Sequence, residues 1–263
     1  VIPAGLLLQV VGAPATLVYG AMLFAGALVA ATRLSSDVVA SDAADAEETT
    51  ELHSSNVQLG AIAMTVLRGL VGFTFFHLAF WLRSQDQGTL WFAAVVGVSA
   101  LASMFGNAVA SVLRARVREE TMLTVALMVC AGAGLAVSVL GGPFGAVMLA
   151  GVLNLMAALG RLNFESIVQR DAPGANRGRA FAVFETRFQL AWAIGAFIAV
   201  ALQVSGSVGF LIVGAVAVAT SVHLLGRRRA GDATRSPVSR RRPGRARGQA
   251  PRSRSESARR RDG

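Results

Sequence analysis

The chain has 263 residues, of which 54% are hydrophobic and only 15% are charged, whereas a soluble domain of this size carries about 25% charged residues. This balance excludes an ordinary soluble fold. The net charge of +10 belongs mainly to the end of the chain, because 14 of the 25 basic residues lie after Gly226. A fold that is basic throughout is therefore excluded as well.

The first residues, Val1 to Val11, form an apolar stretch that Gly12, Ala13 and Pro14 separate from the next one. A spanning helix needs about 20 apolar residues, so this stretch is too short to cross a bilayer. No charged segment precedes it and no small-residue cleavage site follows it, which argues against a signal peptide. We interpret the stretch as the end of a helix whose beginning is missing.

Seven apolar segments follow, each long enough to span a membrane. They cover residues 15–32, 59–82, 88–113, 121–141, 143–161, 181–203 and 207–226. The sequence therefore predicts an all-α fold, a polytopic bundle of about seven transmembrane helices. The single cysteine, Cys130, lies inside the fourth segment, so a disulfide within one chain is excluded.

Arginines occur in every second link between these segments. They follow the first, third, fifth and seventh segments, whereas the intervening links have Arg83 as their only basic neighbour. Short loops that are rich in Lys and Arg remain on the cytoplasmic side of a membrane. We therefore expect a multi-pass protein of the cell (plasma) membrane, embedded in the lipid bilayer with a cytoplasmic C-terminus.

Composition divides the chain into four parts. Residues 1–34 hold the first apolar stretch and one span, and residues 35–57 form an acidic link without aromatic residues that we expect to be flexible. Residues 58–226 hold the other six spans. Residues 227–263 mix Arg with Ser, Pro and Gly, a composition that cannot form a core and predicts disorder.

Three stretches carry a family resemblance. Residues 68–73 read RGLVGF, residues 169–196 contain RGRAF after a link with Pro and Gly, and Gly106-Asn107 is followed by clustered arginines. With six spans after a long link, they resemble the C-terminal half of a major facilitator superfamily transporter of the drug-efflux type. The residues similar to that family's loop motif are Gly106, Asn107, Arg114, Arg116 and Arg118, although the second Gly of the motif is absent.

The resemblance implies a carrier in which two six-helix halves rock around a central site for a small-molecule substrate. It implies secondary transport by alternating access, in the direction of efflux for the drug-efflux type. A complete carrier has a full set of helices before the long link. Most of the N-terminal half is therefore expected to be missing, and the chain is expected to be a fragment of a longer protein.

Charged and polar residues gather around the link between the fifth and sixth segments. Arg161 and Glu165 are four residues apart, as are Glu185 and Gln189, so each pair shares one face of a helix. Arg187 lies between the second pair on another side. Since these helix ends face the cytoplasm in the expected topology, the five residues predict a cytoplasmic gate whose ion pairs form in one carrier state only. Simple anchoring of the helix ends is the alternative.

Other polar and aromatic residues lie inside the spans, where polar groups are costly and are candidates for function. Arg68 is a candidate contact for a substrate or an anion, or a partner for an acid elsewhere in the bundle. Alternatively it extends to the membrane surface. An apolar pocket with one amide is predicted from residues near mid-depth, with packing as the alternative for each. These residues are Phe73, Phe76, Asn154 and Trp192.

His77 lies among phenylalanines, and it is either a proton carrier or a packing residue. The arginine-rich tail directly follows a span, so anionic lipid head groups are its nearest polyanion. A nucleic-acid partner is not expected, because no aromatic residue is interleaved to stack on bases.

The sequence holds no phosphate-binding loop, metal-ligand cluster or nucleophile motif, so neither a cofactor nor an enzymatic activity is expected. A competing interpretation remains: a membrane scaffold or sensor that does not transport and whose basic tail recruits partners.

Overall fold

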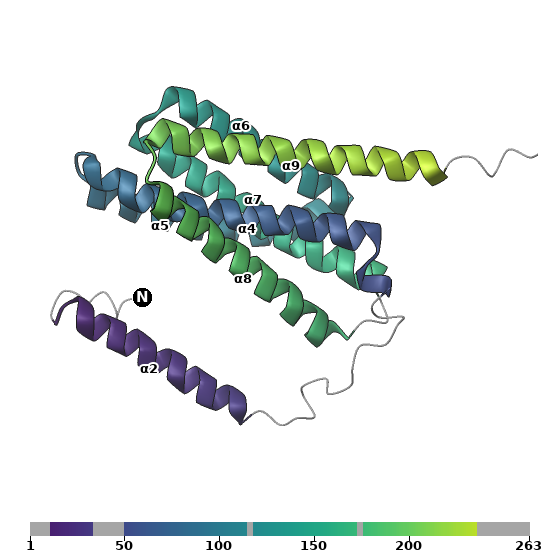
Figure 1. Ribbon diagram of the computed structural model, residues 1–263, viewed down its shortest axis with the longest axis horizontal. Coiled ribbons are helices and arrows are strands. Elements are labelled where there is room, and N and C mark those ends of the chain that lie inside the picture. The colour runs from purple at the N-terminus through teal and green to yellow at the C-terminus, as the bar shows by residue number, and fades with distance from the viewer. Residues whose placement is uncertain (1–10, 34–49, 115–117, 173–175, 236–263) are drawn as a thin grey trace, which may run out of the picture. The chain divides into compact units, whose positions relative to one another are not determined.

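The computed structural model describes residues 11–33, 50–114, 118–172 and 176–235, most of which lie in long helices (Figure 1). The elements are α2 (Ala13–Thr32), α4 (Ser55–Trp81), the 3-10 turn η2 (Leu82–Ser84), α5 (Gly88–Arg114), α6 (Glu119–Leu140), α7 (Gly142–Asp171), α8 (Arg177–Leu202) and α9 (Gly206–Arg235). Within the described part, seven helices are long and apolar enough to span a membrane. The predicted all-α polytopic fold is therefore confirmed.

Several helices extend beyond the apolar segments that predicted them, among them α4, α7 and α9. α4 begins at Ser55, inside the expected link, and α9 continues to Arg235, inside the expected tail. α7 runs past position 161 to Asp171. Hydropathy marks only the part of a helix that suits lipid, whereas helical hydrogen bonding continues through polar residues beyond it. The first apolar stretch and most of the link and tail lie outside the described residues, at 1–10, 34–49 and 236–263.

Helices α4 to α8 run alternately in opposite directions, so their ends gather at two levels. At the first level, called the charged end, Asn56 of α4 and Glu119 of α6 contact Arg170 and Asp171 in the last turn of α7. The opposite level, called the turn end, holds the short connections that follow α4, α6 and α8. Contacts between charged side chains therefore concentrate at the charged end, where the longer links of the chain begin and end.

The connection between α6 and α7 depends on two glycines and a proline. Gly141 and Gly142 have φ angles of 67° and 79°, a left-handed conformation that costs a glycine little. Pro143 then lies in the first turn of α7, where its missing N–H has no helical partner to lose. The sharp reversal that places α7 antiparallel to α6 is thus encoded locally.

Glycines also let α4 and α8 approach each other. A Cβ atom on Gly72 of α4 would lie 2.1 Å from the carbonyl oxygen of Trp192 in α8. A Cβ atom on Gly195 of α8 would lie 2.1 Å from the carbonyl oxygen of Gly69 in α4. Small residues at such crossings are typical of membrane helices, because lipid supplies no hydrophobic force that drives helices together. The backbones of the two helices are therefore in direct contact.

Two further crossings have the same basis. A Cβ atom on Gly106 of α5 would lie 2.9 Å from the carbonyl oxygen of Leu155 in α7, and one on Gly134 of α6 would lie 2.7 Å from the nitrogen of Gly214 in α9. Much of the apolar core comes from α4 and α7, which contribute Leu67, Leu78, Leu149, Leu153 and Ile167 among others. These two helices hold the polar groups described below in fixed positions.

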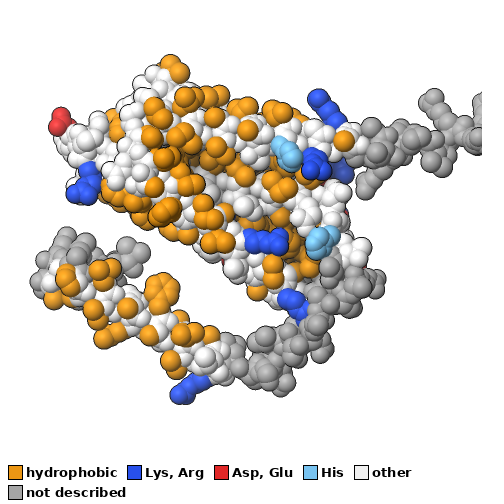
Figure 2. All heavy atoms as spheres, viewed as in Figure 1, with side chains coloured by type: hydrophobic (Ala, Val, Ile, Leu, Met, Phe, Trp, Pro, Cys, Tyr) orange, Lys and Arg blue, Asp and Glu red, His pale blue; other side chains and the backbone are white. Residues whose placement is uncertain are grey.

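The surface of the bundle agrees with a lipid environment. Hydrophobic side chains cover most of the face of the bundle seen in Figure 2, and charged side chains are few there. Large apolar residues on α5 and α8, including Leu101, Phe105, Leu190 and Phe197, are more than half exposed. In water such a surface would drive association, whereas in a bilayer it is satisfied by acyl chains.

Gly72→Ala is expected to separate α4 from α8, because the added methyl group meets backbone atoms that cannot rotate away. We expect the free energy of unfolding in lipid nanodiscs to fall by about 2 kcal/mol. Gly132→Ala is the matched control, since a Cβ atom there meets nothing within 4 Å. The free energy of unfolding of this variant should stay within about 1 kcal/mol of the value for the parent chain. Equal stability of the two variants would contradict the close crossing.

Candidate functional site

Four charged side chains and one amide from α4, α7 and α8 form a connected group, called the Glu185 network. Nη2 of Arg68 lies 3.4 Å from Oε1 of Glu185, and Nη2 of Arg161 lies 4.0 Å from Oε2 of Glu185. Nε2 of Gln189 donates to Oε1 of Glu185 at 2.7 Å. Nε of Arg161 donates to Oε1 of Glu165 at 3.1 Å. The network therefore ties three helices together through one carboxylate.

The Glu185 network is half-buried. The side chain of Arg68 is 22% exposed, that of Glu185 is 37% exposed and that of Arg161 is 51% exposed. Fully buried ion pairs are expensive to separate, because each charge is left without a partner in a medium of low dielectric constant. Partial exposure lowers that cost. Separating these pairs therefore costs less than separating a fully buried pair.

The structure joins two sets of residues that the sequence treated separately. Arg68, predicted as a substrate contact or as a partner for an acid, pairs with Glu185 of the predicted gate. It is the middle residue of α4, about 20 Å from either end. Arg187, also assigned to the gate, points elsewhere, with its guanidinium carbon 5.8 Å from the ring centroid of Phe184.

The predicted aromatic residues separate into two groups. Phe76 of α4 and Trp192 of α8 meet edge to face, with ring centroids 5.9 Å apart. Phe73 is 4% exposed and stacks on His77, whose ring in turn meets Phe210 of α9. Phe76 and Trp192 therefore belong to the α4–α8 side of the bundle, whereas Phe73 packs toward α9.

His77 is held in a tight apolar setting. Its side chain is 3% exposed, and a Cβ atom on Gly209 of α9 would lie 2.1 Å from its Nε2. No residue of the described ranges is hydrogen-bonded to that nitrogen. Of the two interpretations of His77, this geometry favours packing between α4 and α9.

Asn154 faces a small cavity between α4, α5 and α7. Its Nδ2 donates to the carbonyl oxygen of Ala150 at 2.9 Å, which leaves its Oδ1 as an acceptor. Thr74, on the opposite wall, is 2% exposed, and its hydroxyl has no hydrogen-bond partner among the described residues. The cavity is lined by Val71, Thr74, Phe75, Val95, Ser99, Ala150, Leu153 and Asn154. The four residues from which one pocket was predicted thus lie in three places: Phe76 with Trp192, Phe73 beside His77, and Asn154 at this cavity.

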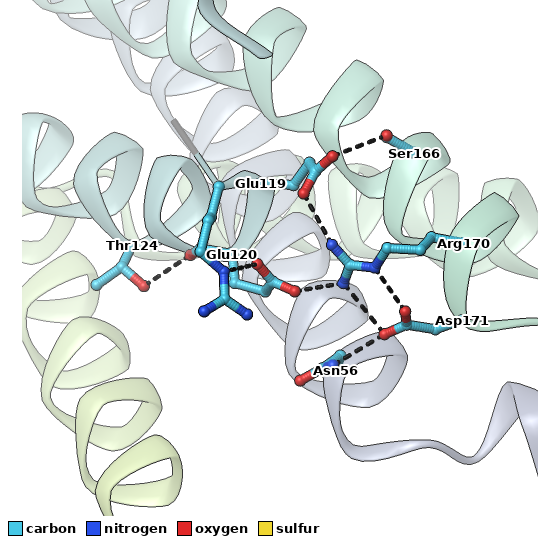
Figure 3. A network of polar contacts seen from close by, with 8 residues as sticks. Asn56, Glu119, Glu120, Thr124, Ser166, Arg170 and Asp171 are labelled. Atoms are coloured by element: carbon cyan, nitrogen blue, oxygen red, sulfur yellow. Dashed lines mark hydrogen bonds and ion pairs between the residues drawn. The ribbon is translucent and has the colours of Figure 1, made fainter. Parts of the chain in front are cut away.

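A second polar group, the Arg170 network, lies at the charged end (Figure 3). Arg170 of α7 donates from Nη1 to Glu119 at 2.9 Å and from Nε to Asp171 at 2.7 Å, and its Nη2 contacts Glu120. Asp171 also accepts from Nδ2 of Asn56 in α4 at 2.9 Å. One guanidinium therefore joins the first turn of α6 to the last turn of α7, and Asp171 extends the connection to α4.

The Arg170 network was not predicted from the sequence, although part of it has a local signal there. Glu119 and Glu120 lie in the first turn of α6, where acidic residues are favoured by the helix dipole. Arg170 lies in the last turn of α7, where a basic residue is favoured for the same reason. Their contact across about 50 residues of chain has no such signal, because it depends on how α6 and α7 pack.

The structure describes part of the predicted loop motif. Gly106 lies inside α5 and touches α7, while Asn107 beside it is exposed. Arg118 precedes α6, with Nε 3.8 Å from Oε2 of Glu120 and its side chain 83% exposed. Arg114 is the last residue of α5, and Arg116 lies outside the described residues.

Arg170→Gln is expected to leave the carboxylates of Glu119, Glu120 and Asp171 close together without their shared cation. The free energy of unfolding should fall by about 2 kcal/mol, less than for a fully buried pair because Arg170 is 42% exposed. Adding Glu120→Gln should recover part of the loss, since it removes one repelling charge. Arg83→Gln, at an exposed arginine of the turn end, serves as the control. Equal losses for Arg170→Gln and Arg83→Gln would contradict the network.

A comparison with families of known proteins finds a match. The family described as Major Facilitator Superfamily matches residues 2–196, which is most of the chain and includes every residue of the Glu185 network. Neither a curated protein nor a solved structure matches the chain. Among the described residues, no group of three or more His, Cys, Asp or Glu is placed to hold a metal ion.

Proposed function

The chain belongs to the major facilitator superfamily and is a multi-pass membrane transporter, and we propose that it exports small molecules by alternating access. Members of this superfamily are transporters rather than enzymes. This membership favours transport over the scaffold or sensor interpretation. The export direction is supported by the resemblance of residues 169–196 to drug-efflux carriers.

The Glu185 network is the observation that supports a gate. It connects α4, α7 and α8 through ion pairs of 3.1 to 4.0 Å that are partly exposed. A switch between two conformations needs contacts that are favourable in one state and lost in the other. Because Glu185 has partners on two other helices, a shift of α8 relative to either one changes the pairing. We propose that these pairs hold the cytoplasmic side of the carrier closed.

We propose further that α4 to α9 form one half of the carrier, and that a second six-helix half supplies the opposite wall of the path. The six helices follow residues 34–49, which separate them from α2. A site that opens to one side of the membrane at a time needs two walls that move against each other. The substrate contacts proposed here, Arg68, Phe76 and Trp192, lie on the α4–α8 side of the bundle.

Glu185→Gln tests the gate, because it keeps the shape and the Gln189 contact but removes the charge that Arg68 and Arg161 share. In cells that make the complete carrier, efflux of the anionic dye carboxyfluorescein should fall by about tenfold, as expected for a shift of about 1.4 kcal/mol between the two states. The amount of protein in the membrane should not change. Asp86→Asn, an exposed acid of the turn end, is the control and should leave efflux intact. Equal efflux in both variants would remove Glu185 from the gate.

The proposed orientation places the charged end and the C-terminus in the cytoplasm of the cell, with the arginine-rich tail against anionic lipid head groups. The arginine-rich links at the charged end support this orientation, because basic loops remain on the cytoplasmic side of a membrane. Single cysteines at Ser84 and Asn176, in a Cys130→Ala chain, test the orientation. A membrane-impermeant maleimide added to intact cells should label position 84 and spare position 176. Labelling of position 176 would reverse the topology.

A further inference from the structure

Arg68 brings more hydrogen-bond donors to the Glu185 network than its neighbours use. A guanidinium has five N–H donors. Within the described residues its contact is the one to Glu185, and at 3.4 Å this is longer than the usual 2.9 to 3.0 Å for such a bond. The Nε of Arg68 is buried and has no partner there. Among the described residues, most of the N–H donors of Arg68 are therefore without an acceptor.

The carboxylates of the Glu185 network, in contrast, already have hydrogen-bond donors and cations close to them. Glu185 accepts from Gln189 at 2.7 Å and has Arg68 and Arg161 within 4.0 Å. Glu165 accepts from Arg161 at 3.1 Å. If Arg68 leaves Glu185, that carboxylate keeps one hydrogen-bond donor, Gln189, and the ion pair with Arg161, whereas Arg68 keeps no partner among the described residues. The group that completes this network is thus an acceptor with a negative charge rather than a cation.

An aromatic surface lies on the same pair of helices. Phe76 is eight positions after Arg68 on α4, and Trp192 is seven positions after Glu185 on α8, a rise of about 10 to 12 Å toward the turn end. The two rings contact each other, and both side chains are partly exposed. A two-ring aromatic molecule with a short polar head is about long enough to span this distance. Its head can reach Arg68 while its rings lie against Phe76 and Trp192.

We propose that the cargo of this transporter is an amphipathic aromatic anion. Its carboxylate replaces Glu185 as the partner of Arg68, and its ring lies against Phe76 and Trp192. A carboxylate suits this position because a guanidinium binds it through two parallel N–H donors. Glu185 then stays with Gln189 and Arg161, so cargo binding opens one ion pair of the network. This inference rests on the proposed transport function and assigns the substrate class of the same site.

Binding of matched aromatic probes to the purified chain in nanodiscs tests the proposal. The probes are 2-naphthoate, 2-naphthylmethanol and 2-naphthylmethylammonium, which share one ring system and differ in the head group. Quenching of tryptophan fluorescence gives the affinity of each. We expect 2-naphthoate to bind at least about tenfold more tightly than the other two. Equal affinities, or tighter binding of the ammonium probe, would overturn the assignment of an anion.

Variants then locate the head group. Arg68→Gln should weaken 2-naphthoate binding by about tenfold and leave the alcohol unchanged, while Arg83→Gln should change neither. Glu185→Gln should bind 2-naphthoate at least as tightly as the parent chain, because it frees Arg68 from its competitor. If Arg68→Gln does not insert, Arg68→Lys replaces it, and a loss of about threefold or more is expected because the fork of donors is gone.

These outcomes separate the substrate class from transport itself. Unchanged 2-naphthoate binding in the Arg68 variants would overturn the anion site, even if dye efflux still depends on Glu185. Loss of 2-naphthoate binding in Arg68→Gln, with dye efflux unaffected by Glu185→Gln, would retain the site and remove the gate.

Discussion

Direct backbone contact between α4 and α8 is the constraint on which the polar side of this transporter depends. Helices in a bilayer gain little by burying apolar side chains against each other, so close fit and polar contacts hold them together. Gly72 and Gly195 allow that fit. Arg68 and Glu185 approach each other from the same two helices. A wider separation would remove the one partner that Arg68 has among the described residues, inside a span where an unpaired charge is costly.

The two polar networks differ in strength, and the difference agrees with different roles. Between helices, Arg170 of α7 donates to Glu119 of α6 at 2.9 Å at the charged end, where it fixes helix ends to one another. The contacts of Arg68 and Arg161 with Glu185 are 3.4 and 4.0 Å. Short bonds to several partners resist movement, whereas long, shared and partly exposed bonds are easier to exchange. This comparison supports a gate at Glu185 and an anchor at Arg170.

Much of the fold was predictable, because membrane insertion depends on local sequence. The apolar segments located all seven membrane helices of the described part, and the spacing of four residues correctly paired Arg161 with Glu165 and Glu185 with Gln189. Helix ends were less predictable. α7 and α4 continue through polar residues that hydropathy assigns to links, since a helix in water is held by the same backbone hydrogen bonds as one in lipid.

The sequence by itself determined that this is a membrane protein of seven apolar helices, with arginines in alternate links and charged pairs along single helices. These properties follow from composition and from the 3.6-residue period, which act within one segment. Only the tertiary structure decided that Arg68 meets Glu185 across 117 positions, that Arg187 turns away, and that Arg170 joins three carboxylates. Such contacts depend on where two helices cross, and that position is set by the fit of small residues along both helices rather than by either helix alone.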